Sequence, residues 1–138
     1  MKIVLDTNVV VSAFLSPAGK PANILQLVLR HDFDICFNTA ILAEYEQVLG
    51  RSKFAGKLHQ PAIRRFFELM KEFGVNIICV PSQVALPDEA DRIFYDVAQA
   101  AGAVLVTGNK KHYPNETFIK DPSEYIAQLR LDLTTGPS

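Results

Sequence analysis

The stretch KIVLDTN, residues 2–8, decides the fold of this chain. Its first four residues, 2–5, form a short apolar run of strand type, and the polar residues Asp6, Thr7 and Asn8 follow at once. This pattern is typical of a buried strand that leads into a turn. An acid directly after a buried strand loses hydration, which is costly unless a partner or a cation lies beside it. Asp6 is therefore the first candidate functional residue.

Outward from this stretch, strands and helices are predicted to alternate. Apolar runs predict further strands at residues 33–37, 76–80, 103–106 and 118–119. Apolar residues at helical spacing predict helices at residues 9–15, 22–30, 40–49, 61–73, 87–101 and 122–131. Strands that are apolar throughout are typical of a parallel sheet covered on both faces. The predicted fold class is α/β, a three-layer α/β/α sandwich around a parallel sheet of four or five strands.

Length and composition indicate one globular domain. The 138 residues are 49% hydrophobic and 21% charged, which is ordinary for a folded protein. We expect a domain at residues 1–131 and a flexible C-terminal tail at residues 132–138. No apolar run approaches the roughly 18 residues that cross a bilayer, and Asp6 interrupts the first run before the roughly 7 that a secretory leader needs. A cytoplasmic location is expected. The formal net charge of -1 does not favour a partner held by bulk charge alone, such as duplex DNA.

Polar residues follow two of the predicted strands at their carboxyl ends, where an open parallel sheet binds its ligands. Asp6 follows the first strand, and Thr107 and Asn109 follow the fourth. These two strand ends should share one edge of the sheet. Two further acids, Asp88 and Asp91, lie at the beginning of the helix that precedes the fourth strand.

Most of these residues also have a purely structural interpretation. Asp88 and Asp91 are spaced as helix N-capping chemistry requires. Glu44, in the helix after the second strand, is consistent with a solvated helix residue. The hydroxyl of Thr7 and the amide of Asn8 could orient Asp6 or a metal-bound water, or only satisfy the turn, and for Asn8 a helix cap is the more favoured interpretation. Asp96 is expected to be exposed, because it falls off the helical face that carries Asp91.

Convergence of Asp6, Glu44 and Asp91 would point to a divalent cation. Three carboxylates without a compensating base resist ionisation, and a bound cation resolves the conflict. Oxygen ligands suit Mg²⁺ or Mn²⁺, whereas Cys36 and Cys79 lack the spacing of a zinc or redox motif. The chemistry that such a site suits is phosphodiester hydrolysis, in which a metal activates water and stabilises charge on the phosphate.

Basic residues lie beside the proposed site. The run after Asn109 is either a solvated loop or a set of contacts to substrate phosphates, and it consists of Lys110, Lys111 and His112. A second basic stretch, which could form a rim for RNA, follows the helix that carries Glu44 and contains Arg51, Lys53 and Lys57. Asn109 itself could hold a metal-bound water or a phosphate oxygen through its amide.

Three blocks of the chain together resemble the PIN domain family, to which many VapC-type ribonuclease toxins belong. They are IVLDTNVVVSA at 3–13, ILAEYEQVL at 41–49 and PDEADRIFYDVAQAAGAVLVTGN at 87–109. The segment GNKKHYPNETFIKDPSEYI at 108–126 resembles a subset of toxin components of toxin–antitoxin pairs. The sequence departs from the family pattern at the fourth acidic position, where Asn109 stands, and Asp88 supplies an additional carboxylate.

The resemblance implies a sheet ordered 3-2-1-4-5 and Mg²⁺- or Mn²⁺-dependent endonucleolytic cleavage of single-stranded RNA. It also implies a homodimer and a cognate antitoxin protein that blocks the site. Residue by residue, the resemblance implies catalytic and metal-binding roles for Asp6, Glu44 and Asp91. Asp88 would support the metal, and the assisting residues would be Asn8, Thr107 and Asn109.

Two other functions fit the sequence. The missing fourth acid keeps open a PIN-fold module that binds RNA or a protein partner without cutting it. An Asp after the first strand is also the nucleophile of some α/β phosphotransferases of the haloacid-dehalogenase type. Those enzymes need a second Asp two residues later, and here that residue is Asn8.

Overall fold

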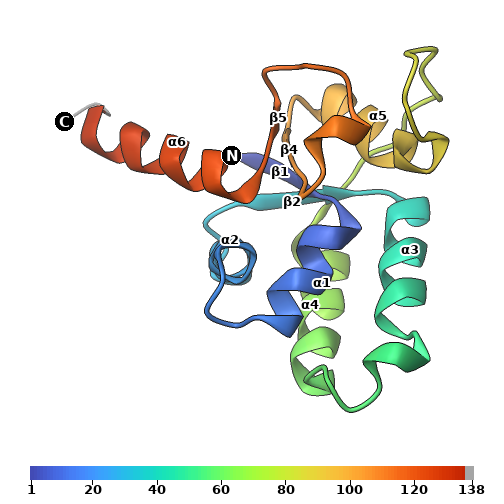
Figure 1. Cartoon of the computed structure of the whole chain (residues 1–138), viewed down its shortest axis with the longest axis vertical. Coiled ribbons are helices and arrows are strands. Elements are labelled where there is room, and N and C mark those ends of the chain that lie inside the picture. The colour runs from blue at the N-terminus through green and yellow to red at the C-terminus, as the bar shows by residue number, and fades with distance from the viewer. Residues whose placement is uncertain (136–138) are drawn as a thin grey trace.

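A five-stranded parallel sheet forms the centre of the molecule in the computed structural model, which describes residues 1–135 (Figure 1). The strand order is β3-β2-β1-β4-β5, as expected from the resemblance. The strands are β1 Lys2–Leu5, β2 Asp34–Phe37, β3 Val75–Asn76, β4 Val104–Val106 and β5 Ile119–Lys120. In the central pairs Ile3 faces Ile35 of β2 and Val4 faces Leu105 of β4. Because β1 has a neighbour on each side, its carboxyl end lies in the middle of one sheet edge.

Helices cover both faces of this sheet, so the predicted α/β/α sandwich is confirmed. Helices α1 to α4 lie on one side and α5 on the other, and α6 packs against α2 (Figure 1). Their bounds are α1 Thr7–Leu15, α2 Lys20–Leu29, α3 Thr39–Leu49, α4 Gln60–Phe73, α5 Arg92–Ala101 and α6 Pro122–Thr135. In the described part of the chain, three short 3-10 turns occupy Ser52–Phe54, Glu89–Asp91 and Lys110–His112. Within residues 1–135 no helix is long and apolar enough to cross a membrane.

The third strand is shorter than predicted. It ends at Asn76 instead of residue 80, because its partner β2 ends at Phe37. The next residue, Asn38, turns away to cap α3, and its side-chain oxygen accepts a hydrogen bond from the backbone N–H of Ile41 at 2.8 Å. The backbone N–H of Ile77 still donates to the carbonyl of Phe37 at 2.8 Å, and the ladder with β2 does not continue through residues 78–80. Cys36 is buried in β2, whereas Cys79 lies outside the sheet and is half-buried.

The largest differences from the predicted helix boundaries are at the start of α5 and the end of α6. Helix α5 begins at Arg92 rather than at residue 87, because a 3-10 turn capped by Asp88 precedes it. Helix α5 ends at Ala101, as predicted, and the next residue, Gly102, has the left-handed backbone (φ 64°) that suits glycine. Helix α6 continues to Thr135, past the predicted end at residue 131, and residues 136–138 of the predicted tail lie outside the described residues.

A buried tyrosine joins α3 to the end of β1. Tyr45 is completely buried, and its hydroxyl donates a hydrogen bond to the backbone carbonyl of Leu5, the residue before Asp6. The ring of Tyr45 packs against the rings of Phe66 and Phe94 in the core. This contact fixes the helix that carries Glu44 against the strand that ends at Asp6.

Candidate functional site

A cleft of about 450 Å³ opens at the carboxyl ends of β1 and β4, and we call it the acidic cleft. Four acids line it: Asp6, Glu44, Asp88 and Asp91. The other lining residues are Thr7, Asn8, Val11, Ser12, Val48, Arg51, Lys53, Phe54, Asn109 and His112. The fold thus brings together acids that lie up to 85 residues apart in the sequence.

Asp6 is the most buried of these acids, at 6% exposure. Its backbone N–H donates to the carbonyl of Val106 at 2.9 Å, which ties the end of β1 to β4. One carboxylate oxygen, Oδ2, accepts hydrogen bonds from the hydroxyls of Thr107 at 2.8 Å and Tyr113 at 2.9 Å. Burial raises the pKa of Asp6 above its ordinary value, and these hydrogen bonds oppose the rise. The carboxylate is therefore fixed in place and poorly hydrated.

Glu44 enters the acidic cleft from α3. Its Oε2 accepts a hydrogen bond of 2.5 Å from the hydroxyl of Thr7, the residue after Asp6. The turn that follows β1 therefore positions two acids, one directly and one through a hydroxyl. The possibility that Glu44 points only into solvent is excluded by this contact.

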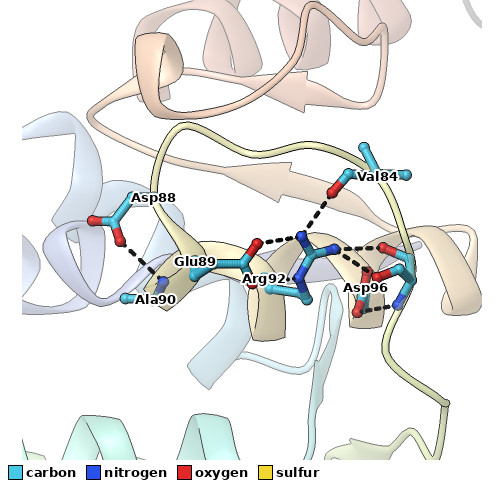
Figure 2. Close-up of polar contacts among 7 residues, drawn as sticks. Val84, Asp88, Glu89, Ala90, Arg92 and Asp96 are labelled. Atoms are coloured by element: carbon cyan, nitrogen blue, oxygen red, sulfur yellow. Dashed lines mark hydrogen bonds and ion pairs between the residues drawn. The ribbon is translucent and has the colours of Figure 1, made fainter.

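Asp88 and Asp91 enter from the segment before α5. Asp88 Oδ1 accepts a hydrogen bond of 3.0 Å from the backbone N–H of Ala90, so the capping role is present (Figure 2). Asp91 forms no such cap, and its Oδ2 is buried with no hydrogen-bond donor among the described residues. The polar group close to that oxygen is Nδ1 of His112, at 3.3 Å. Burial, together with the charges of Asp6 and Asp88, raises the pKa of Asp91 to about 6.

The structure corrects the prediction for Asn8. Helix α1 begins at Thr7, with Asp6 at the cap position, so Asn8 lies inside the first turn and does not cap the helix. Its side-chain oxygen instead accepts a hydrogen bond of 2.9 Å from the backbone N–H of Gly108. Asn8 therefore joins α1 to the loop that follows β4.

Thr107 and Asn109 occupy that same loop. The Thr107 hydroxyl donates to Asp6 and accepts a hydrogen bond of 3.0 Å from the backbone N–H of Asn109. The side-chain nitrogen of Asn109 lies 3.0 Å from Nε2 of His112. The amide of Asn109 thus contacts the imidazole.

The predicted basic residues divide into two groups. His112, Arg51 and Lys53 line the acidic cleft, and the ammonium of Lys53 lies 5.1 Å from the ring centre of Phe54. The residues that do not line it are Lys57, Lys111 and Lys110, the last of which pairs with Glu124 of α6 at 2.9 Å.

Asp96 is buried at 7% exposure, so the prediction of an exposed side chain was wrong. Its Oδ2 accepts a hydrogen bond of 2.9 Å from the backbone N–H of Ser82, because the segment before the 3-10 turn folds back over α5. Arg92 holds the same segment (Figure 2). Its guanidinium donates to the carbonyls of Ser82 at 2.8 Å and Val84 at 2.7 Å and pairs with Glu89 at 2.5 Å. These contacts fix the segment that carries Asp88 into the acidic cleft.

The donor set of the acidic cleft fits a hard divalent cation. Four carboxylates supply the oxygen ligands that Mg²⁺ and Mn²⁺ accept. Oδ2 of Asp91 is buried without a hydrogen-bond partner among the described residues, and burial raises the pKa values of Asp6 and Asp91 although the nearby His112 opposes the rise. A cation bound between Asp6, Glu44 and Asp91, with Asp88 beside them, would remove that unfavourable charge.

One positioning residue, Tyr113, which holds Asp6, was missed in the sequence, whereas Thr7 was expected to orient Asp6 or a metal-bound water and its hydroxyl holds Glu44. Tyr113 is buried, and the pKa of its hydroxyl is raised by burial and by the neighbouring acids. Its only signal in the sequence was its place directly after the polar loop that follows β4.

Tyr113→Phe tests this role. Loss of one of the two donors to Asp6 Oδ2 is expected to weaken Mn²⁺ binding by about 10- to 100-fold, the usual effect of removing a group that orients a metal ligand. Isothermal titration calorimetry measures the change. Tyr95→Phe is the matched control, since Tyr95 is also buried and donates to a carboxylate, Glu116, outside the acidic cleft. Equal Mn²⁺ affinity in the two variants would show that Tyr113 does not support the site.

Fold and site together define an α/β protein with a carboxylate cluster at the carboxyl edge of a parallel sheet. The model of the PIN domain family matches residues 2–111, and the chain belongs to this family. It is 30% identical over 131 residues to an uncharacterized protein, MJ1680, of Methanocaldococcus jannaschii, covering 91% of this chain and 79% of the relative.

A solved structure shares the fold. The chain resembles a chain of the crystal structure of VapBC2 from Rickettsia felis bound to a DNA fragment from their promoter, with a TM-score of 0.54 and 19% identity. The match covers 88% of this chain and 98% of that one.

Proposed function

We propose that this protein is a divalent-metal-dependent endoribonuclease that hydrolyses phosphodiester bonds of single-stranded RNA. The observation that carries the proposal is the convergence of Asp6, Glu44, Asp88 and Asp91 on one cleft, with a buried oxygen of Asp91 lacking a hydrogen-bond donor among the described residues. Membership of the PIN domain family supports the same conclusion.

The chain's own residues prepare the site. Thr107 and Tyr113 hold the carboxylate of Asp6, and Thr7 holds that of Glu44, so two of the acids are oriented before an ion arrives. Asp6, Glu44 and Asp91 would ligate Mg²⁺ or Mn²⁺, and Asp88 would assist. The bound ion would supply Lewis acidity, which lowers the pKa of a water and stabilises charge on the phosphate.

The rim of the acidic cleft carries the charge that an RNA backbone requires. Arg51 and Lys53 line the cleft with the acids, beside the ring of Phe54. Phosphates next to the scissile bond would contact these side chains, and a base could stack on the aromatic ring. Because the whole chain has a formal charge of -1, its net charge does not attract RNA. The attraction would come from the two basic side chains at the rim.

Loss of charge at the rim is expected to weaken RNA binding without changing the metal site. In an Asp6→Asn background, the Arg51→Gln/Lys53→Gln variant should lower the slope of log Kd against log salt concentration by about 1.4, because each phosphate contact to a single strand contributes about 0.7. Fluorescence anisotropy with a short labelled RNA measures the slope. Lys57→Gln removes a charge that lies outside the cleft lining, so this variant should keep the wild-type slope. If Lys57→Gln lowered the slope as much as the double variant does, the rim would not be the binding surface.

We propose further that the protein is the toxin of a toxin–antitoxin pair that acts in the cytoplasm as a homodimer. Support comes from the shared fold with a chain of the VapBC2 structure and from the segment at 108–126. A cognate antitoxin would block the acidic cleft. Growth arrest on expression, relieved by co-expression of the neighbouring reading frame, is the expected result.

The protonation of Asp91 gives the metal site a pH dependence. With a pKa of about 6, against an ordinary 3.8, Asp91 binds its proton more tightly in the folded protein than in the unfolded chain. The metal-free protein should therefore lose stability as pH rises from about 4 to about 6. Since the ion must displace this proton, Mn²⁺ affinity should rise by up to about tenfold per pH unit below pH 6 and then level off. Calorimetry from pH 5 to pH 8 measures the Mn²⁺ affinity, and in Asp91→Asn the affinity should depend less on pH. A pH-independent Mn²⁺ affinity in the wild type would contradict the role of Asp91.

Cleavage of RNA tests the proposed function. Purified protein is incubated with end-labelled single-stranded RNA in Mn²⁺, in Mg²⁺ and in EDTA, with duplex RNA and single-stranded DNA as controls. Cleavage of single-stranded RNA that EDTA stops is the expected result. Binding of RNA without any cleavage would instead favour a non-cutting module, a function that Asn109 at the fourth acidic position keeps open.

A further inference from the structure

An imidazole lies within the carboxylate cluster of the acidic cleft. His112 lines the cleft, and its Nδ1 is 3.3 Å from the buried Oδ2 of Asp91. Asp88, Asp91 and His112 form a group of potential metal ligands whose donor atoms all lie within 4.8 Å of one another. Ligands of a single ion, at bonds of about 2.0–2.2 Å, lie at most about 4.4 Å apart, so small side-chain adjustments would let one ion contact all three.

Asn109 is placed to hold this imidazole. Its side-chain nitrogen lies 3.0 Å from Nε2 and 3.4 Å from Nδ1 of the ring, so Nε2 is the nearer of the two ring nitrogens. A metal-ligating histidine usually donates its second ring N–H to a carbonyl or carboxylate oxygen. Rotation of the Asn109 amide by half a turn presents its oxygen to Nε2–H, which leaves the lone pair of Nδ1 directed toward the side of Asp91. The amide of Asn109, at the fourth acidic position, then orients the imidazole of His112.

We infer that His112 is a nitrogen ligand of the metal and that Asn109 is its positioning residue. The inference rests on the proposed function for the presence of a cation in the acidic cleft. A nitrogen donor changes which cation the site prefers, because imidazole suits transition metals, whereas Mg²⁺ favours oxygen ligands. The site therefore selects Mn²⁺, or another divalent transition ion, over Mg²⁺.

A different role for His112 predicts the opposite result. If the imidazole served only as a positive counter-charge to Asp91, it would repel an incoming cation. Its removal would then strengthen the binding of Mn²⁺ and Mg²⁺ alike. The direction of the change in affinity separates the two roles.

The experiment compares metal binding by the wild type and His112→Gln. Mn²⁺ affinity is measured from the electron paramagnetic resonance signal of free Mn²⁺, and Mg²⁺ affinity from competition against Mn²⁺. We expect His112→Gln to lose about 10- to 100-fold in Mn²⁺ affinity and less than about threefold in Mg²⁺ affinity. Unchanged or stronger Mn²⁺ binding would overturn the inference. His59→Gln is the matched control, because His59 is exposed and lies outside the cleft lining, and it should bind both ions as the wild type does.

A second measurement needs no variant and so does not depend on the fold of His112→Gln. In the wild type with one equivalent of Mn²⁺, pulsed electron paramagnetic resonance should detect coupling to a directly bound nitrogen. Its absence from a protein that binds Mn²⁺ in the cleft would overturn the inference. Neither readout uses RNA. A protein that shows the nitrogen coupling but cleaves no RNA would keep the inference and lose the proposed function.

Discussion

Replacing Asp6 with asparagine is expected to lower the rate of metal-dependent RNA cleavage by at least about a thousandfold. A metal ion stabilises charge in the transition state by several kcal/mol, and a loss of about 4 kcal/mol corresponds to this factor. Asp6 should contribute most, because it is the most buried of the four acids and two hydroxyls hold it in place. Single-turnover cleavage of labelled RNA in Mn²⁺ measures the effect.

The fold should survive this substitution. Asparagine keeps an oxygen that accepts from Thr107 and Tyr113, and it removes a buried negative charge from a repulsive cluster. The metal-free variant should therefore be at least as stable as the wild type. Asp34→Asn is the matched control, because Asp34 is an exposed acid at the opposite end of the sheet. The Asp34→Asn protein should cleave RNA at the wild-type rate. Undiminished cleavage by folded Asp6→Asn protein would refute the mechanism.

Removal of divalent cations is expected to stop cleavage and to lower the melting temperature. Binding of an ion at a hundred times its dissociation constant stabilises a protein by about 2.7 kcal/mol. For a domain of this size the shift in Tm between Mn²⁺ and EDTA should be roughly 10 °C. The acids gain most from the ion, because burial and mutual repulsion destabilise them in its absence.

Differential scanning fluorimetry in Mn²⁺ and in EDTA measures this shift, with Asp6→Asn as the control that should lose most of it. Restoration of both the Tm and the cleavage by added Mn²⁺ completes the test. Equal Tm values in Mn²⁺ and EDTA, together with cleavage that persists in EDTA, would show that the acidic cleft does not depend on a metal.

Much of the fold was predictable because the decisive patterns are local. The run before Asp6 gives the central strand, and the continuous apolar strands give a parallel sheet with helices on both faces. The end of β3 was not predictable from its own residues. The end of β3 depends on where Asn38 ends the neighbouring strand β2, so it is set by the pairing of the two strands.

The candidate site divides in the same way. The acids follow from strand ends and helix starts, so Asp6, Asp88 and Asp91 could be placed near one edge of the sheet. The partner Tyr113 could not, because its contact with Asp6 joins residues far apart in the chain and follows no strand end or helix start. The burial of Asp96 was missed for a similar reason. A segment with no regular structure covers it, and helical spacing alone cannot show such a cover.

We propose that Asp6, Glu44 and Asp91 together hold a divalent cation. Anomalous X-ray diffraction from crystals grown with Mn²⁺ tests it most directly. We expect a manganese peak in the acidic cleft at about 2.0–2.3 Å from carboxylate oxygens of these three residues. Manganese bound only elsewhere, in crystals of a protein that cleaves RNA in Mn²⁺, would contradict it.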